Sequence, residues 1–187
     1  MTGEEHPGEG ARDVRLPTWV VVWFAVSSVI QAYDALFVLL GPLSHTGGSL
    51  AGLWPGHQLY ARFDHRYADF DAFGTAQSVA NLVEVLVMLW VLWHARRRSG
   101  VVVGLIVATA TFWKTVLYFG VEGASGLAMT RQSLERGDLP GFLMIAILPN
   151  LFWIVVPLCV VITLGRRLMH SGRVLSVDPH GLDNDAR

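Results

Sequence analysis

Residues 101–121 read VVVGLIVATATFWKTVLYFGV, a run in which Lys114 is the one charged residue. At the α-helical rise of about 1.5 Å per residue, about 20 apolar residues cross the hydrocarbon core of a bilayer. A water-soluble domain spreads charged residues along its length, and this stretch does not. It therefore predicts a transmembrane α-helix.

Three further apolar segments, residues 17–40, 71–93 and 141–164, are long enough to span a bilayer. Most charged residues lie at the chain ends and in the connections between these segments. The sequence thus predicts an all-α, integral membrane protein, a four-helix transmembrane bundle forming one domain over residues 17–170. The polar tails, residues 1–16 and 171–187, are predicted to be disordered.

Arginine placement predicts the orientation of the bundle, because cytoplasmic connections carry an excess of basic residues. With four spans, one side receives the following arginines: Arg12, Arg15, Arg96, Arg97, Arg98, Arg166, Arg167 and Arg173. The other side has fewer arginines, and aspartate and glutamate dilute them. Both termini are therefore expected in the cytoplasm. For a bacterial host, the protein would lie in the plasma membrane.

Several partners are not expected. The formal net charge of -1 and the lack of a basic stripe with interleaved aromatics argue against a nucleic-acid partner. No histidine falls inside a span and Cys159 is the single cysteine, so no metal site is expected. No glycine-rich phosphate loop or nucleophile elbow occurs, and no cofactor is expected. The sequence leaves open whether the protein forms a homodimer.

The loop after the first span, residues 43–70, is amphipathic, with aromatic and aliphatic residues among polar ones. Two interpretations remain open. The loop lies on the membrane interface or caps the bundle, or its aromatic residues form only a belt at the headgroups.

Polar residues inside the spans are the main clue to function, because a charged side chain at the centre of a bilayer costs about 2.5–3.5 kcal/mol on insertion scales. They are Gln31 and Asp34 in the first span; Gln77, Ser78, Asn81 and Glu84 in the second; Thr111, Lys114, Thr115, Tyr118 and Glu122 in the third; and Asn150, close to Trp153, in the fourth.

Helical spacing places the polar residues of the second and third spans on one face of each helix. Glu84 precedes Arg96 by twelve residues and Lys114 follows Val101 by thirteen, so both lie at similar depth, about 18–20 Å from the cytoplasmic end. We expect a Glu84–Lys114 ion pair. The pair could simply join two helices, but interhelical polar contacts in membranes average only about 0.6 kcal/mol. A functional cavity is the leading interpretation.

Several short motifs resemble the emopamil-binding protein family, whose EXPERA-domain members include sterol Δ8–Δ7 isomerases. The similarity covers about residues 17–170. Its motifs, in chain order, are Trp23-Phe24-Ala25-Val26; Asp34; Leu53-Trp54, Leu59-Tyr60, Asp64-His65-Arg66-Tyr67 and Asp71-Ala72-Phe73; Val116-Leu117-Tyr118-Phe119 with Glu122; and Asn150-Leu-Phe-Trp153 with Pro157. The resemblance implies an EXPERA-like bundle that receives an apolar, sterol- or terpenoid-shaped substrate from the membrane.

This chain departs from the family pattern at positions that bear on catalysis. The glutamate and threonine of the family's catalytic helix fall on Ser78 and Asn81. Either Glu84, deeper in the same helix, replaces the family's proton donor, or this chain does not isomerise a sterol.

The leading hypothesis is a cofactor-independent isomerase, or a related proton-initiated cyclase, that shifts a carbon–carbon double bond in a sterol-like or isoprenoid lipid. Its expected catalytic residues are Asp34, Glu84 and Asn81. The residues expected to bind substrate are Gln31, Ser78, Lys114, Thr115, Tyr118, Asn150 and Trp153. The rival hypothesis is a non-catalytic protein that binds a lipid or a hydrophobic amine. A proton-coupled carrier is less favoured, since four helices without inverted halves are few for alternating access.

Overall fold

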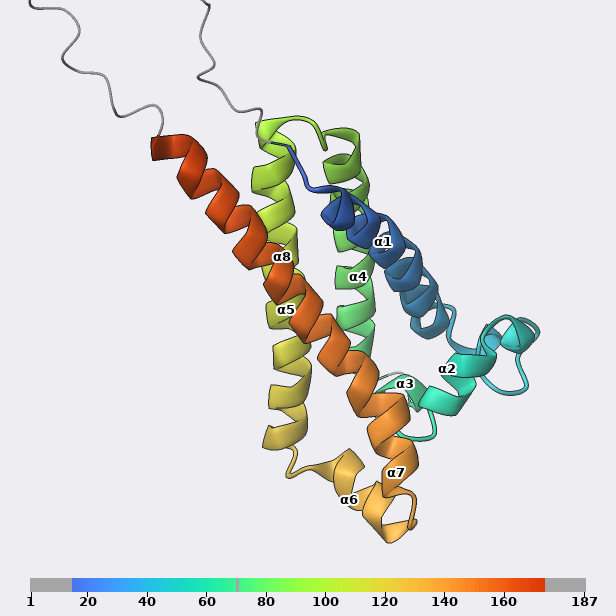
Figure 1. Ribbon diagram of the computed structural model, residues 1–187. Coiled ribbons are helices and arrows are strands. Elements are labelled where there is room, and N and C mark those ends of the chain that lie inside the picture. Colours follow the sequence, from blue (N-terminus) through green and yellow to red (C-terminus); the bar gives the residue numbers. More distant parts are fainter. Residues whose placement is uncertain (1–14, 70, 174–187) are drawn as a thin grey trace, which may run out of the picture.

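The computed structural model describes residues 15–69 and 71–173 (Figure 1). Within these residues, four helical segments are long and apolar enough to cross a membrane: α1 (Thr18–Leu39), α4 (Ala72–Trp93), α5 (Arg98–Ala124) and Leu139–Ser171, most of which is α8. By length and composition, the protein is a multi-pass membrane protein, which confirms the prediction of four spans.

The predicted disordered tails lie mostly outside the described residues. At the C-terminal side, α8 continues to Arg173, so residues 171–173 extend the last helix.

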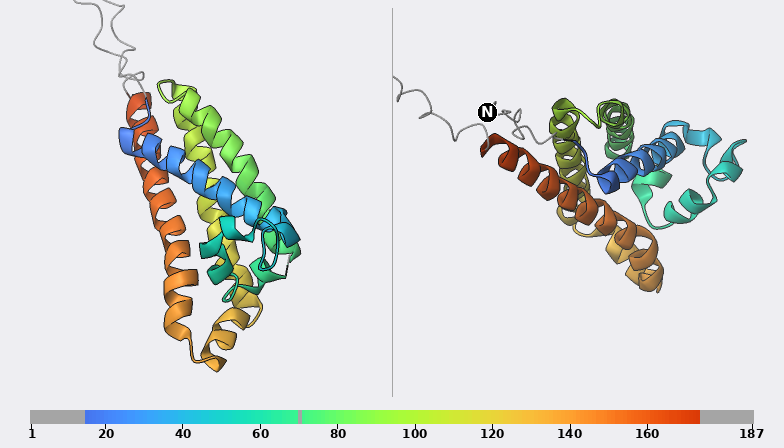
Figure 2. Two further views of the ribbon diagram at one scale, coloured as in Figure 1. Left: turned by 90° about the vertical axis from the view of Figure 1, so that its right-hand side faces the viewer. Right: turned by 45° about the horizontal axis from the view of Figure 1, so that its top comes forward.

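The four spans pack as a series in which α1 contacts α4, α4 contacts α5, and α5 contacts α8 (Figures 1 and 2). The start of α1 lies beside the turn between α4 and α5, since the Leu16 N–H donates to the Ala95 carbonyl at 2.9 Å. The end of α8 is close by, because Arg167 Nη1 donates to the Arg15 carbonyl at 3.0 Å. Both described chain ends therefore meet at one end of the bundle, as an even number of spans requires.

An apolar core fills this end of the bundle. Its buried members include Phe24 from α1, Val91 from α4 and Leu164 from α8. All three meet at Gly104 of α5, where a Cβ atom would lie only 3.2–3.4 Å from their side chains. Glycine at this position therefore lets the helices approach closely.

Local sequence explains where two of the spans begin or end. Asp71 caps α4, because its Oδ1 accepts hydrogen bonds from the backbone N–H groups of Phe73 at 2.6 Å and Gly74 at 3.2 Å. After α1, Gly41 has a φ of 53°, a left-handed conformation that glycine adopts without strain and that often ends a helix.

The fourth span is not one regular α-helix. It begins with α7 (Leu139–Phe142), continues through a π-helical turn (η3, Leu143–Ile147) and proceeds as α8 (Leu148–Arg173). Pro149 lacks an N–H group, and its ring would clash with the carbonyl four residues earlier in a regular α-helix. The π-helical turn ends at Ile147, two residues before Pro149, and accommodates this proline.

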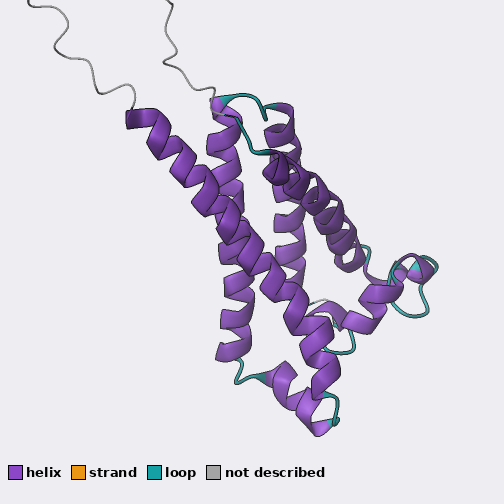
Figure 3. Cartoon of the chain, viewed as in Figure 1, coloured by secondary structure: helices purple, strands orange, loops and turns teal. Residues whose placement is uncertain are grey.

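The loop after α1 caps the bundle. We call residues 43–69 the cap; they contain the 3₁₀ turn η2 (Ala51–Leu53) and the short helices α2 (Pro55–Tyr60) and α3 (His65–Ala68) (Figure 3). A first 3₁₀ turn, η1 (Gly41–Leu43), leads into it. Trp54 and Phe63 are buried against α1 and the fourth span, respectively. The amphipathic pattern thus reflects packing onto the bundle, although Leu53 and Leu59 stay exposed.

A second connection, between α5 and the fourth span, contains α6 (Ala128–Glu135). Glu122, near the end of α5, accepts hydrogen bonds from the N–H groups of Met129 at 3.0 Å and Thr130 at 3.2 Å. This carboxylate therefore stabilises the first turn of α6, where the helix dipole favours a negative charge.

Candidate functional site

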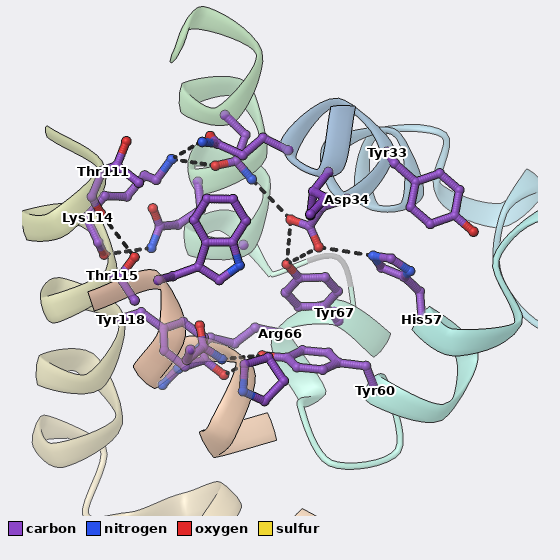
Figure 4. Close-up of a pocket in the computed structure, with 18 of the residues that line it drawn as sticks. Tyr33, Asp34, His57, Tyr60, Arg66, Tyr67, Thr111, Lys114, Thr115 and Tyr118 are labelled. Carbon is purple, nitrogen blue, oxygen red and sulfur yellow. Dashed lines mark hydrogen bonds and ion pairs between the residues drawn. The ribbon is translucent and has the colours of Figure 1, made fainter. Parts of the chain in front are cut away.

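A cavity of about 440 Å³ lies between the cap and the half of the bundle farther from the chain ends (Figure 4). All four spans and both cap helices contribute to its walls. The predicted site residues that line it are Gln31, Asp34, Asn81, Lys114, Thr115, Tyr118, Asn150 and Trp153. The bundle therefore gathers polar residues from distant parts of the sequence around one cavity.

Two predicted site residues, Ser78 and Glu84, are not among those that line the cavity. The Ser78 hydroxyl donates to the Gly74 carbonyl of its own helix at 2.9 Å. Glu84 is buried behind Lys114 and Thr111, between α4 and α5. In this arrangement, Glu84 contacts the residues of the cavity wall rather than the cavity itself.

The carboxylate of Asp34 accepts hydrogen bonds from side chains of the cap and of α4 (Figure 4). The Tyr67 hydroxyl lies 2.8 Å from both Asp34 oxygens. His57 Nε2 lies 3.1 Å from Oδ1, and Asn81 Nδ2 donates to Oδ2 at 3.1 Å. Burial, and then the charge of Asp34, raise the pKa of Tyr67 well above its usual value of 10.0, so this hydroxyl remains a donor.

The ring of His57 is held in place by two aromatic neighbours from α1. Its centroid lies 5.0 Å from that of Tyr33, in an edge-on arrangement, and 5.1 Å from that of Phe37. The cap therefore contributes an oriented imidazole to the Asp34 carboxylate.

A chain of hydrogen bonds connects Asp34 to the predicted ion pair. Asn81 donates to Asp34 through its Nδ2 and accepts from the Lys114 ammonium through its Oδ1. Lys114 Nζ lies 2.9 Å from Glu84 Oε2, which confirms the expected pair, and 3.3 Å from Gln31 Oε1. Residues of α1, α4 and α5 thus form one continuous polar network along the cavity wall.

A second polar cluster joins the cap to α5 and α8. Asp64 Oδ2 accepts from the Tyr118 hydroxyl at 2.6 Å, and the hydroxyl groups of Tyr118 and Tyr60 lie 3.3 Å apart. Asn150 Nδ2 completes the cluster by donating to the Tyr60 hydroxyl at 3.0 Å. Burial raises the pKa of both Asp64 and Tyr60 above their usual values.

The cavity reaches the surface of the protein between α1, α2 and α8. Exposed residues on these helices also line it: Ile30 and Tyr33 on α1, Gly56 on α2 and Pro149 on α8. Ile30 and Pro149 belong to membrane-spanning segments and carry no polar side-chain atoms. An opening with these walls suits a ligand that arrives from the lipid phase.

Among the residues of the cavity wall that were not predicted as site residues are four with polar side chains from one segment: His57, Tyr60, Arg66 and Tyr67. All four belong to the cap, whose short helices show no sustained periodicity in the sequence. The aromatic content of the loop was the available signal, and it did not indicate which side chains face inward.

Among residues 15–69 and 71–173, no group of three or more His, Cys, Asp or Glu side chains could hold a metal ion together.

Comparisons of the chain with protein-family models, with curated proteins and with solved structures find no match. The resemblance to the emopamil-binding protein family therefore stays a prediction.

Proposed function

We propose that the protein is a membrane-embedded isomerase, or a related proton-initiated cyclase, with an EXPERA-like fold. Its substrate would be a sterol-like or terpenoid lipid, and the reaction would move a carbon–carbon double bond. The observation that carries this proposal is the position of Asp34, a carboxyl group on the cavity wall with hydrogen-bond donors from Tyr67, His57 and Asn81.

The reaction requires one proton to be added and another removed. In the protonated form, Asp34 would transfer its proton to one carbon of the double bond, and the π electrons would form the new C–H bond. The neighbouring carbon becomes a carbocation. A proton then leaves a different adjacent carbon for the Asp34 carboxylate, and its C–H electrons form the shifted double bond, so no cofactor is consumed.

Three features of the site would lower the energy of the charged intermediate. The donors Tyr67, His57 and Asn81 stabilise the carboxylate that forms when Asp34 gives up its proton. The indole of Trp153, on the cavity wall, offers an aromatic face to a cation. The positive charge of Lys114 is balanced by Glu84, so the ion pair adds little repulsion toward the carbocation.

A non-catalytic binding protein is the second candidate function, and one observation favours it. Asp34 is the only carboxylate among the described residues that line the cavity. The cavity therefore does not offer two carboxyl groups, one to act as the general acid and the other as the general base. A single carboxylate beside aromatic rings would suit a hydrophobic amine in its protonated form.

One experiment separates the two functions. Purified protein is incubated in heavy water with sterol and linear isoprenoid candidates, and deuterium in the recovered lipid is measured. An isomerase incorporates deuterium, and Asp34→Asn should reduce the rate about 10²–10⁴-fold, as loss of a general acid does. The matched control is Asp138→Asn, the same exchange at an exposed residue outside the cavity.

Binding of a hydrophobic tertiary amine is measured in parallel, because a protonated amine imitates the carbocation. Both functions predict that Asp34→Asn weakens amine binding. If the wild type binds lipid yet never incorporates deuterium, the isomerase proposal is wrong and the binding function is retained.

A further inference from the structure

Arg66 of α3 lines the cavity and has an unused hydrogen-bond donor. Only 4% of its surface is exposed. Its Nη2 lies 3.6 Å from Glu122 Oε2, but no described residue accepts a hydrogen bond from its Nη1, which is fully buried. Buried polar atoms of this kind nearly always have a partner, since leaving one unpaired costs free energy. A buried, unpartnered donor on a cavity wall therefore indicates a ligand atom that accepts from it.

The charges around Arg66 indicate what kind of acceptor fits. Glu122 faces the guanidinium directly, and Asp64 accepts from the Arg66 backbone N–H at 3.0 Å. The positive charge of Arg66 is already balanced by Glu122 whether Asp64 is ionised or protonated. A second negative charge from a ligand would be uncompensated in this buried place. The remaining donor therefore favours a neutral oxygen over a carboxylate, sulfate or phosphate.

The position of Arg66 relates this oxygen to the reacting end of the ligand. Arg66 belongs to the cap, and its guanidinium lies 5.3 Å from the ring of Tyr118, which follows Lys114 by one helical turn. The cap lies at the end of the bundle away from the described chain ends (Figure 1). Phe73 and Ile145 provide apolar wall in the same cavity. A lipid whose oxygen lies at Arg66 would keep its hydrocarbon body against the rest of the cavity wall, which includes Asp34 and Trp153.

We infer that Arg66 is a second anchor of the cavity and binds a neutral hydroxyl or keto oxygen at one end of an apolar, ring-sized lipid. This inference rests on the proposed function, because it names the substrate class for the same cavity. The substrate is an alcohol or ketone of a polycyclic or terpenoid hydrocarbon, with its reacting double bond near Asp34 and its oxygen at Arg66.

The test uses a pair of probes bound to the full-length, detergent-purified protein. One is a steroid with a tertiary amine at one end and a hydroxyl group at the other, and its partner lacks only the hydroxyl. A hydrogen bond to a charged donor predicts that the wild type binds the hydroxylated probe about 10–100-fold more tightly. In Arg66→Met this ratio should fall to about 1, whereas Arg62→Met, the same exchange at an exposed arginine of the cap, should leave it unchanged.

The ratio of the two affinities does not depend on how much of a variant is folded. The comparison of the two probes on the wild type needs no variant at all. Equal binding of the two probes by the wild type overturns the inference, as does a ratio that survives in Arg66→Met. Tighter binding of a probe with sulfate in place of the hydroxyl overturns the neutral-oxygen assignment. The proposed function fails separately, when Asp34→Asn leaves the affinity for both amines unchanged.

Discussion

The ammonium group of Lys114 contacts the carboxylate of Glu84 across the interface of α4 and α5, with 2.9 Å between Nζ and Oε2. Both side chains are largely buried, and the Thr111 hydroxyl donates to the same Glu84 oxygen at 2.8 Å. Asn81 then connects Lys114 to Asp34. The ion pair thus neutralises two charges inside a membrane span and positions the amide that contacts the candidate acid.

Removal of one partner of this pair should destabilise the protein far more than removal of both. Glu84→Gln or Lys114→Met alone leaves an uncompensated buried charge, which costs about 3–5 kcal/mol in comparable buried pairs. The double variant should recover much of that loss, as measured by the thermal midpoint in detergent. Thr111→Val serves as a control that removes one hydrogen bond to Glu84 and keeps both charges. Additive losses in the double variant would show that the charges are not coupled.

The spans and the ion pair could be predicted because both follow from regular helical geometry. The rise per residue fixes the depth of Glu84 and Lys114, and the helical repeat fixes the face on which each lies. Lipid offers no hydrogen bonds, so polar faces of neighbouring helices turn toward one another. Asp34, Asn81 and the ion pair were found for these reasons.

The cap side of the site could not be predicted in the same way. α2 and α3 have only six and four residues, too short to show a periodic pattern. His57 reaches Asp34 because its ring is held by Tyr33 and Phe37, a contact between segments that local sequence does not encode. Ser78 was assigned to the cavity as a polar residue of the second span, at the position of the family's catalytic glutamate, but its hydroxyl bonds to its own helix.

Both termini should lie in the cytoplasm. The start of α1 and the end of α8 meet at one end of the bundle, and Arg96–Arg98 join the spans at that same end. Basic residues are retained on the cytoplasmic side. Topology reporters fused at residue 5 and residue 180 should therefore both report cytoplasm. A C-terminal reporter that is exported would contradict the orientation, and opposite results at the two ends would contradict the number of spans.

Ionisation of Asp64 should make the protein less stable as pH rises. Burial raises the pKa of this carboxyl above its usual 3.8, although hydrogen bonds from Tyr118 and Arg66 act in the opposite direction. Between the two pKa values the unfolded chain has lost this proton while the folded protein keeps it. The folded state therefore binds more protons, and the free energy of unfolding falls as pH increases through this window.

Asp64→Asn removes this titration and keeps a side-chain oxygen that can accept from the Arg66 backbone N–H at the start of α3. The thermal midpoint of the wild type, taken relative to that of Asp64→Asn, should decrease from about pH 4 toward neutral pH. Asp69→Asn, the same exchange at an exposed residue of the cap, should show no such trend relative to the wild type. If the thermal midpoint of the wild type instead increases relative to that of Asp64→Asn as pH rises, the folded protein stabilises the ionised carboxylate. The pKa of Asp64 would then be lowered and not raised.

Tyr67 should assist the reaction only through Asp34, because its hydroxyl lies 2.8 Å from both oxygens of that carboxylate. Its removal in Tyr67→Phe costs a hydrogen bond to the charge that forms when Asp34 releases its proton. Such a bond is worth about 1.5–3 kcal/mol, so deuterium incorporation should slow about 10–100-fold. Tyr67→Phe combined with Asp34→Asn should be no slower than Asp34→Asn alone, since the charge it stabilises is then absent. A further loss in the double variant would mean that Tyr67 contacts the substrate directly, and its role as a positioning residue for Asp34 would have to be abandoned.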